Sequence, residues 1–232
     1  MRRLLALALL PLLAACDVPT SPETGPSEPL PAVSRTGGPQ SIADFRAVVA
    51  RVEPVAERVC RANTTGVNCD FNIIVDDRRE LGANAYQTYD ANGRPVLGVT
   101  PALIRKMMNR DEIAFVIGHE AAHHIEGHIQ QTQVSATTGA ILGNVLGSAI
   151  GLDPAGVEVA TNIGGTVGAR RFSKGFELQA DSLGARITEA AGYNAVRGVL
   201  YFMDAPDPGD RFLGTHPPNA DRITVVRNAV GR

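Results

Sequence analysis

His119-Glu120-Ala121-Ala122-His123 decides how this chain is organised, and it continues the mostly apolar run Glu112–Gly118. Residues four apart on an α-helix lie on one face, about 6 Å apart, so both imidazoles can reach a single metal ion. Glu120 follows the first histidine and projects beside the metal. This is the H-E-x-x-H pattern, in which two histidines bind zinc and a carboxylate accepts a proton from the water that zinc holds. The stretch predicts a zinc-bearing helix, and the rest of the chain must supply a third ligand.

The segment Phe176–Asp181 offers that ligand. A catalytic zinc keeps three protein ligands and one open position. Glu177 is the strongest candidate, and it shares a helical face with Asp181, four residues on. One carboxylate can bind the zinc while the other accepts a hydrogen bond from a ligand histidine. Composition alone would favour two solvated acids on a surface helix, and it is the H-E-x-x-H pattern that favours the ligand.

Three further histidines compete for a role. His124 and His128 are also four apart, but they lie roughly 140° around the helix from the first pair. Ile125 follows His124, so this register lacks an adjacent base. We interpret both as satisfied core or packing groups. His216 lies between Thr215 and two prolines, in a loop that could steady an oxyanion, occupy the open zinc position or merely cap the last helix.

Composition and charge place the chain among ordinary globular proteins. It has 232 residues, of which 44% are hydrophobic, and a net charge of −2. Because the charge is near neutral and no basic cluster occurs, nucleic acid is excluded as an expected partner.

The N-terminus has the pattern of an export signal. Arg2-Arg3 precede the apolar run Leu4–Leu13, which is too short to span a bilayer. Leu13-Ala14-Ala15-Cys16 resembles the lipobox of bacterial lipoproteins, which implies cleavage before Cys16 and acylation of this residue. Several acyl chains form a stable membrane anchor. An ordinary secretory signal with an incidental cysteine is the alternative.

The expected domain boundaries and cellular location follow from this signal. We expect a signal peptide over residues 1–15, a lipidated cysteine with a flexible tether over 16–40 and one folded domain over 41–232. The tether is rich in Pro, Ser, Thr and Gly and contains almost no large apolar residues. The expected location is the periplasmic side of a bacterial envelope membrane, with inner and outer membrane undecided.

Cys60 and Cys69 remain once Cys16 is lipidated. In an oxidising compartment, this pair around a turn predicts a disulfide, with two buried free thiols as the alternative.

Periodicity and capping residues predict an α+β fold, mostly helical, with a small antiparallel sheet beside the motif helix. The first helix, capped by Ser41, contains Pro54, which should kink or split it. Asp111 can cap the motif helix. The expected strands are Phe71–Val75, Asn84–Tyr89 and Pro95–Thr100, with a hairpin turn at Asp90–Gly93; the other helices are Ile42–Cys60, Pro101 to about Asn109, Ser173–Ala191, Asn194–Met203 and a last one ending near Ala229.

The segment Ile129–Leu152 contains no charged residue. Its glycines recur every fourth residue and would form one smooth helical stripe that lets another backbone approach closely. Three interpretations remain open: a helix packed on the domain, a membrane-surface or self-association element, and a membrane span diluted by polar residues. The stripe consists of Gly139, Gly143, Gly147 and Gly151.

Taken together, these motifs resemble a family. The chain is similar to the gluzincin metallopeptidases that include the heat-shock protease HtpX, the prenyl-protein (CAAX) endopeptidase and periplasmic lipoprotein proteases, known as metallopeptidase family forty-eight. The matching pieces stand in the family's order from Phe71 to Ile223: Asn84-Ala85, the strand Val96–Thr100, His119-Glu120-x-x-His123 with His128, Glu177-x-x-x-Asp181, and His216-Pro217 with Arg222.

The resemblance implies a zincin-like fold with one Zn²⁺ held by His119, His123 and Glu177. It implies that Glu120 is the catalytic base, that Asp181 supports a ligand, and that His216 and Arg222 lie near the catalytic centre. The strand Val96–Thr100 would be the edge that pairs with an extended substrate. No repeat domain follows, and the interval that spans the membrane in other members is here glycine-rich and polar.

The expected function is zinc-dependent hydrolysis of peptide bonds in unfolded or misfolded envelope proteins by a lipid-anchored endopeptidase. An envelope binding or chaperone-like factor with a latent or structural zinc site is the alternative. Because a structural site needs no base, the intact Glu120 favours the enzyme. An oligomer formed through the glycine-rich helix is left open.

Overall fold

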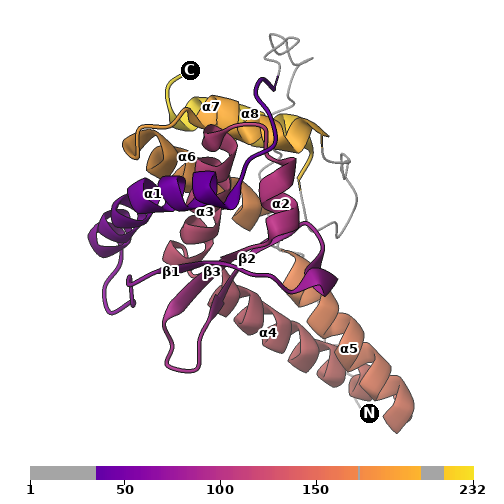
Figure 1. Ribbon diagram of the computed structural model, residues 1–232. Helices are drawn as coiled ribbons and strands as arrows, with labels where there is room; N and C mark the ends of the chain where they lie inside the picture. The colour runs from indigo at the N-terminus through magenta and orange to yellow at the C-terminus, as the bar shows by residue number, and fades with distance from the viewer. Residues whose placement is uncertain (1–34, 172, 205–216) are drawn as a thin grey trace, which may run out of the picture. The chain divides into compact units, whose positions relative to one another are not determined.

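The computed structural model describes residues 35–171, 173–204 and 217–232, which belong to one compact unit, Val33–Arg232 (Figure 1). The expected α+β class is confirmed: helices predominate, and one small sheet accompanies them. In chain order the elements are α1 (Ile42–Asn63), β1 (Asn72–Val75), the 3₁₀ helix η1 (Arg79–Leu81), β2 (Ala85–Tyr89), β3 (Pro95–Val99), α2 (Pro101–Lys106), α3 (Arg110–Ile125), α4 (His128–Ala149), α5 (Pro154–Arg171), α6 (Ser173–Ala190), α7 (Ala195–Gly198), the 3₁₀ helix η2 (Val199–Asp204) and α8 (Asn219–Ala229).

The motif helix α3 is the centre of the core. Most of its side chains are buried, because α1 and α6 pack against it on different sides (Figure 1). Its apolar run therefore serves as a helix covered nearly all round. Fully buried side chains that meet in this core include Phe45, Val48, Ile113, Ile117 and Ile187.

The first helix is continuous. Ser41 forms the expected cap, because its hydroxyl accepts from the Asp44 backbone N–H and the Asp44 carboxylate accepts from the Ser41 N–H. Of the kink or split expected at Pro54, the split is wrong, since α1 runs through Pro54 to Asn63. Pro54 and Ala50 lie on the exposed side, where water can bond the carbonyl that proline leaves without a donor.

Residues assigned to the tether already bind the domain. Arg35 forms an ion pair with the fully buried Glu112, at 2.7 Å, and the Gly38 N–H donates to the Met108 carbonyl. At Gly37, with φ of 135°, a Cβ would lie 1.8 Å from the Met108 oxygen, so only glycine fits. The ordered domain thus begins before Ser41; the remainder of the expected tether, the signal and Cys16 lie outside the described residues.

The sheet is mixed, so the expectation of an antiparallel sheet holds for one pair of strands only. Its order is β1-β3-β2, with β2 antiparallel and β1 parallel to β3. The β2–β3 hairpin turns at Asp90–Gly93, as expected, and Gly93 has the left-handed φ of 77° that such turns need. The expectation that Val96–Thr100 is an edge is wrong: β3 is the central strand and is buried throughout, so β2 is an edge.

Two helix boundaries differ from those expected. α2 begins at Pro101 behind the Thr100 cap but ends at Lys106, and Asn109, not Asp111, caps α3 by accepting from the Glu112 N–H. The expected helix over Asn194–Met203 is the short α7 followed by the 3₁₀ helix η2.

The expected disulfide between Cys60 and Cys69 is confirmed and ties the end of α1 to the segment before β1.

α4 and α5 form a long hairpin that extends from the rest of the fold (Figure 1). Gly139 and Gly143 of the expected stripe are covered within the chain: a Cβ at Gly139 would lie 2.1 Å from the Gly164 oxygen, and one at Gly143 would lie 2.2 Å from the Ala160 oxygen. This part of the stripe thus serves the close approach of α5. The expectation is wrong for Gly151, which lies in the loop after α4 with a φ of 79° and nothing within 4 Å of a Cβ. Within the described residues, none of the helices is both long and apolar enough for a membrane span.

Candidate metal centre

The site is built where α3 and α6 cross at two glycines. A Cβ on Gly184 would lie 2.8 Å from the His119 backbone nitrogen, and a Cβ on Gly118 would lie 2.8 Å from the Gly184 oxygen. Real side chains essentially never approach so closely, so both positions require glycine. The two backbones thereby come close enough for side chains of α6 to reach His119.

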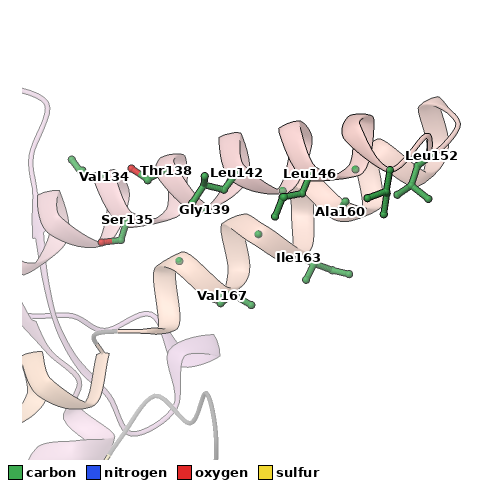
Figure 2. A pocket seen from close by; sticks show the side chains of 15 residues that line it. Val134, Ser135, Thr138, Gly139, Leu142, Leu146, Leu152, Ala160, Ile163 and Val167 are labelled. Atoms are coloured by element: carbon green, nitrogen blue, oxygen red, sulfur yellow. The ribbon is translucent and has the colours of Figure 1, made fainter. Parts of the chain in front are cut away.

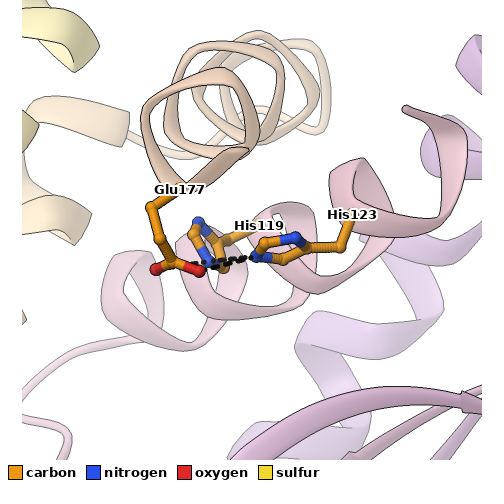
Figure 3. A group of neighbouring side chains, drawn as sticks. All are labelled: His119, His123 and Glu177. Carbon is orange, nitrogen blue, oxygen red and sulfur yellow. Dashed lines mark hydrogen bonds and ion pairs between the residues drawn. The ribbon is translucent and has the colours of Figure 1, made fainter. Parts of the chain in front are cut away.

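Three predicted ligand atoms converge at this crossing (Figure 3). The Nε2 atoms of His119 and His123 are 3.0 Å apart. Glu177 places one carboxylate oxygen 3.7 Å from Nε2 of His119 and the other 3.2 Å from Nε2 of His123. The histidines come from one face of α3, and Glu177 comes from the second turn of α6.

The spacing and chemistry of these donors fit zinc. Four ligands at the usual 2.0–2.1 Å around a tetrahedral zinc lie roughly 3.3 Å from one another. The distances of 3.0, 3.2 and 3.7 Å bracket this value. Two imidazoles and one carboxylate are also the donor set of catalytic zinc sites that keep an open position.

Asp181 lies directly behind the first ligand histidine. Its Oδ1 is 2.9 Å from Nδ1 of His119, so this hydrogen bond leaves Nε2 of the ring for the metal. Arg222 of α8 donates two hydrogen bonds of 2.7 Å to the Asp181 carboxylate. Burial raises the pKa of Asp181, but the hydrogen bonds from Arg222 and His119 outweigh burial and lower this pKa, so the carboxylate is ionised.

His128 lies behind the second ligand histidine, a contact that the sequence interpretation missed. Its Nδ1 is 2.9 Å from Nδ1 of His123, and its Nε2 is 3.0 Å from the Gln179 side-chain oxygen. The ring stacks on Phe176, with centroids 4.4 Å apart. Gly127, in the left-handed conformation, turns the chain between α3 and α4 and brings His128 back toward His123. His128 is therefore more than a packing group.

His124, in contrast, matches the expectation of a core group, but it is satisfied on one side only, since its buried Nδ1 has no hydrogen-bond partner among the described residues. It is buried between Phe71 and Tyr89, and its Nε2 lies 2.8 Å from the Asn68 carbonyl. Burial lowers its pKa, so the ring is neutral at pH 7. It connects the motif helix to the segment beside the disulfide and lies away from the metal ligands.

Comparison with known proteins decides the family. The model of Peptidase family M48 matches residues 43–230, which include every described element of the centre. The chain belongs to this family. It is a metallopeptidase, a metal-dependent hydrolase acting on peptide bonds. No curated protein matched the chain. The match concerns the M48 family as a whole, so the narrower resemblance to its lipoprotein members remains an expectation.

In this M48 peptidase the expected base, Glu120, faces a cleft on both sides of the metal centre. On one side the cleft measures about 310 Å³, lined by Asn84, Leu103 and Phe202 among others. On the other it measures about 490 Å³, lined by Gln87 and residues of α4, α5 and α6. Glu120, His123 and Glu177 line both parts. Burial raises the pKa of Glu120, which brings this carboxylate closer to the pKa that a general base needs.

The edge strand β2 runs beside this M48 cleft. Asn84 and Ala85 border one part of the cleft, and Gln87 borders the other. The substrate edge had been assigned to the neighbouring strand Val96–Thr100 by the family resemblance alone, whereas the all-apolar Pro95–Val99 has the composition of a buried strand and the mixed Ala85–Tyr89 does not. Phe202 of η2, whose ring the Arg222 guanidinium covers at 3.5 Å, was also missed. His216 lies outside the described residues.

Proposed function

We propose that this chain is a zinc-dependent endopeptidase of the bacterial cell envelope, anchored by lipid at Cys16, that cleaves unfolded or misfolded envelope proteins. One observation carries the proposal. Two hollows beside the metal centre share Glu120, His123 and Glu177, so a polypeptide that lay along both would extend past the centre in both directions. An exopeptidase would instead need a wall that stops one end of its substrate.

The residues of the centre divide the chemistry among themselves. When bound by His119, His123 and Glu177, zinc supplies a Lewis acid that polarises a peptide carbonyl and makes water more acidic. Glu120 accepts the proton of the attacking water and passes it to the leaving amine. Asp181 with Arg222, and His128 with Gln179, keep each ligand histidine turned so that Nε2 faces the metal.

The edge strand β2 supports a preference for extended substrates. A peptide added to a sheet edge is held by main-chain hydrogen bonds, which every sequence can make. Compact proteins present few such segments, whereas unfolded chains present many. The cleft therefore favours substrates by their conformation, and it selects extended segments of unfolded chains.

Two features of the sequence support the envelope as its location. The lipobox-like Leu13–Cys16 implies export and acylation, and a disulfide such as Cys60–Cys69 persists in oxidising compartments. Radiolabelled palmitate in cells that produce the chain tests the anchor: wild type should carry label, and Cys16→Ala should carry none. Label retained in Cys16→Ala would contradict lipidation at this residue.

Substitution of the base tests the reaction. The purified protein should bind one zinc ion and cleave casein, an unfolded substrate. Glu120→Gln should retain the zinc, because Glu120 is not a ligand, and should lose activity by about 10³-fold or more, since general-base transfer contributes about 10²–10⁴-fold. Zinc content and cleavage are measured on the same preparation. Undiminished cleavage by Glu120→Gln would show the mechanism to be wrong, and tight casein binding without cleavage by the wild type would favour a chaperone-like factor.

A further inference from the structure

Exposed apolar side chains gather on the α4–α5 hairpin. Of the eleven large hydrophobic residues that are exposed in the described part of the chain, ten belong to the hairpin and its connecting loop, and Val67 is the eleventh. Soluble proteins rarely leave such a group contiguous and uncovered. The ten are Val134, Ile141, Leu142, Val145, Leu146, Ile150, Leu152, Val159, Ile163 and Val167.

Seven of the ten form one face of the hairpin. They line a shallow groove of about 590 Å³ along both helices and the loop, and Figure 2 shows these side chains following the two helices. We call these seven the apolar face: Val134, Leu142, Leu146, Ile150, Leu152, Ile163 and Val167. They are between 39% and 74% exposed, so the packing of α4 on α5 leaves them uncovered.

The groove holds most of the exposed apolar side chains of the hairpin but not all of them, because Ile141, Val145 and Val159 are exposed outside it. Exposed polar side chains such as Thr137, Asn144 and Asn162 do not line the groove, and the Asn144 amide donates to the Thr161 hydroxyl away from it. The groove also shares no residue with the two parts of the active-site cleft.

The composition of the apolar face favours a lipid surface over a protein partner. From Gly127 to Leu152 the chain has no Asp, Glu, Lys or Arg, and the hairpin, residues 128–171, has no aromatic residue. Protein interfaces are anchored by Trp, Tyr and Arg and are rimmed by polar pairs that set register. Val, Leu and Ile separated by small residues supply apolar area without such specificity. Binding to acyl chains grows with the apolar area that is buried and needs no fixed register.

The position of the expected anchor brings this face within reach of a membrane. Eighteen residues separate Cys16 from Arg35, which already binds the domain, and at full extension they span about 60 Å. The 22-residue helix α4 is about 33 Å long. A domain tethered at this distance samples orientations in which the hairpin lies along the bilayer.

We propose that the apolar face of the α4–α5 hairpin binds the surface of a lipid bilayer, lying in the interface with the hairpin axis near the membrane plane. Side chains of this size enter the interfacial layer by about 5–10 Å. The acyl anchor and the hairpin then form two membrane contacts, which orient the peptidase cleft toward the aqueous side. The inference rests on the proposed envelope location of the peptidase.

Vesicle binding without the acyl group tests the inference. The chain from Asp17 onward contains the whole compact unit but cannot be lipidated, and we expect it to sediment with phosphatidylcholine vesicles. Because the apolar face carries no charge, binding should change little with salt or with added anionic lipid. The variant Leu142→Asp/Ile163→Asp should bind about tenfold more weakly or worse, since each substitution removes one buried apolar side chain and adds a charge.

A matched control keeps the result specific. Thr137→Asp/Asn162→Asp adds the same two charges to the same two helices outside the groove and should bind vesicles like wild type. All four substituted residues are exposed, so both variants should fold, which zinc binding checks. Equal loss of binding in both variants would overturn the inference.

Two other outcomes would also overturn it. One is wild-type chain that stays in the supernatant with every vesicle. The other is a dimer by sedimentation that Leu142→Asp/Ile163→Asp converts to monomer without vesicle binding, which would assign the apolar face to a second copy. Casein cleavage, measured in parallel without vesicles, reports on the proposed peptidase separately, so failure of one proposal is distinguishable from failure of the other.

Discussion

At the scale of single residues, each ligand histidine of the metal centre is oriented by the group that its Nδ1 atom contacts. Nδ1 of His119 faces a carboxylate, and Nδ1 of His123 faces a neutral ring nitrogen of His128. Since the Gln179 oxygen accepts from Nε2–H of His128, Nδ1 of His128 is left as an acceptor for the His123 N–H. Burial lowers the pKa of His128 to about 4, which keeps this ring neutral near pH 7. Both ligands therefore present a bare Nε2 to the metal.

Removal of the group behind His123 should weaken the metal site. His128→Ala takes away the acceptor that orients this ring, and outer partners of this kind are worth about 10–100-fold in metal affinity. We expect zinc affinity, measured by competition with a chromophoric chelator, to fall by that factor. His128→Gln, whose side-chain oxygen can accept the same hydrogen bond, should recover part of the loss.

His124→Gln is the matched control for this experiment. His124 is buried on the same helix but bonds the Asn68 carbonyl and no ligand. Its substitution should lower thermal stability while the folded protein binds zinc normally. If both histidine variants lost the same zinc affinity, general destabilisation and not orientation of His123 would be the cause.

At the scale of elements, the crossing of α3 and α6 sets the distance between the histidines and Glu177. The crossing is close because Gly118 and Gly184 face each other without side chains. A helix pair with larger residues here would stand apart by the size of a methyl group or more. The ligand atoms, which now all lie within 4.8 Å of one another, would then be too far apart for one ion.

Gly184→Ala should therefore impair metal binding from a position that touches no metal. Its Cβ would lie 2.8 Å from the His119 nitrogen, so the helices must separate, at a cost of about 1–3 kcal/mol in unfolding free energy. Zinc affinity should fall at least tenfold. Gly175→Ala on the same helix meets nothing within 4 Å and should raise stability by about 0.5–1 kcal/mol with unchanged affinity. Unaltered zinc affinity in Gly184→Ala would contradict the role given to this crossing.

At the scale of the whole molecule, the centre joins segments that are far apart in the chain. α3 carries two ligands, α6 carries the third, and α8 supplies the arginine that pairs with Asp181. The polar side chains of the centre lie within a fold whose core is mostly apolar, with a few other buried polar groups such as Glu112 and Thr188. A bound ion would hold these helices together in the folded state only.

Metal removal should lower the stability of the whole domain. A ligand that binds only the folded state stabilises it by about 2.7 kcal/mol at a free concentration 100 times its Kd. Chelation should thus lower the Tm seen by calorimetry, and added zinc should restore it. Glu177→Ala, which lacks a ligand, should show a much smaller response to zinc. An identical zinc response in wild type and Glu177→Ala would exclude Glu177 as a ligand.

The sequence by itself determined the local chemistry and most of the elements. Helical spacing placed His119 and His123 on one face. The capping residues Ser41 and Thr100 marked the starts of α1 and α2, and turn residues marked the hairpin between β2 and β3. These features depend on residues within one or two turns of each other, so periodicity and side-chain type suffice to predict them. The motif order, read as a resemblance, also anticipated the M48 family.

Tertiary structure alone decided which strand lies at the edge, what covers the glycine stripe and what stands behind His123. Each answer joins parts of the chain that are remote in sequence: β1 beside β3, Gly164 against Gly139, and Gln179 with His128. The all-apolar composition of β3 fits a buried strand without showing which strands flank it, and a glycine stripe suits any close neighbour. Only packing selects among such neighbours, because the free energy of burial depends on which surfaces meet and not on the residues of one segment.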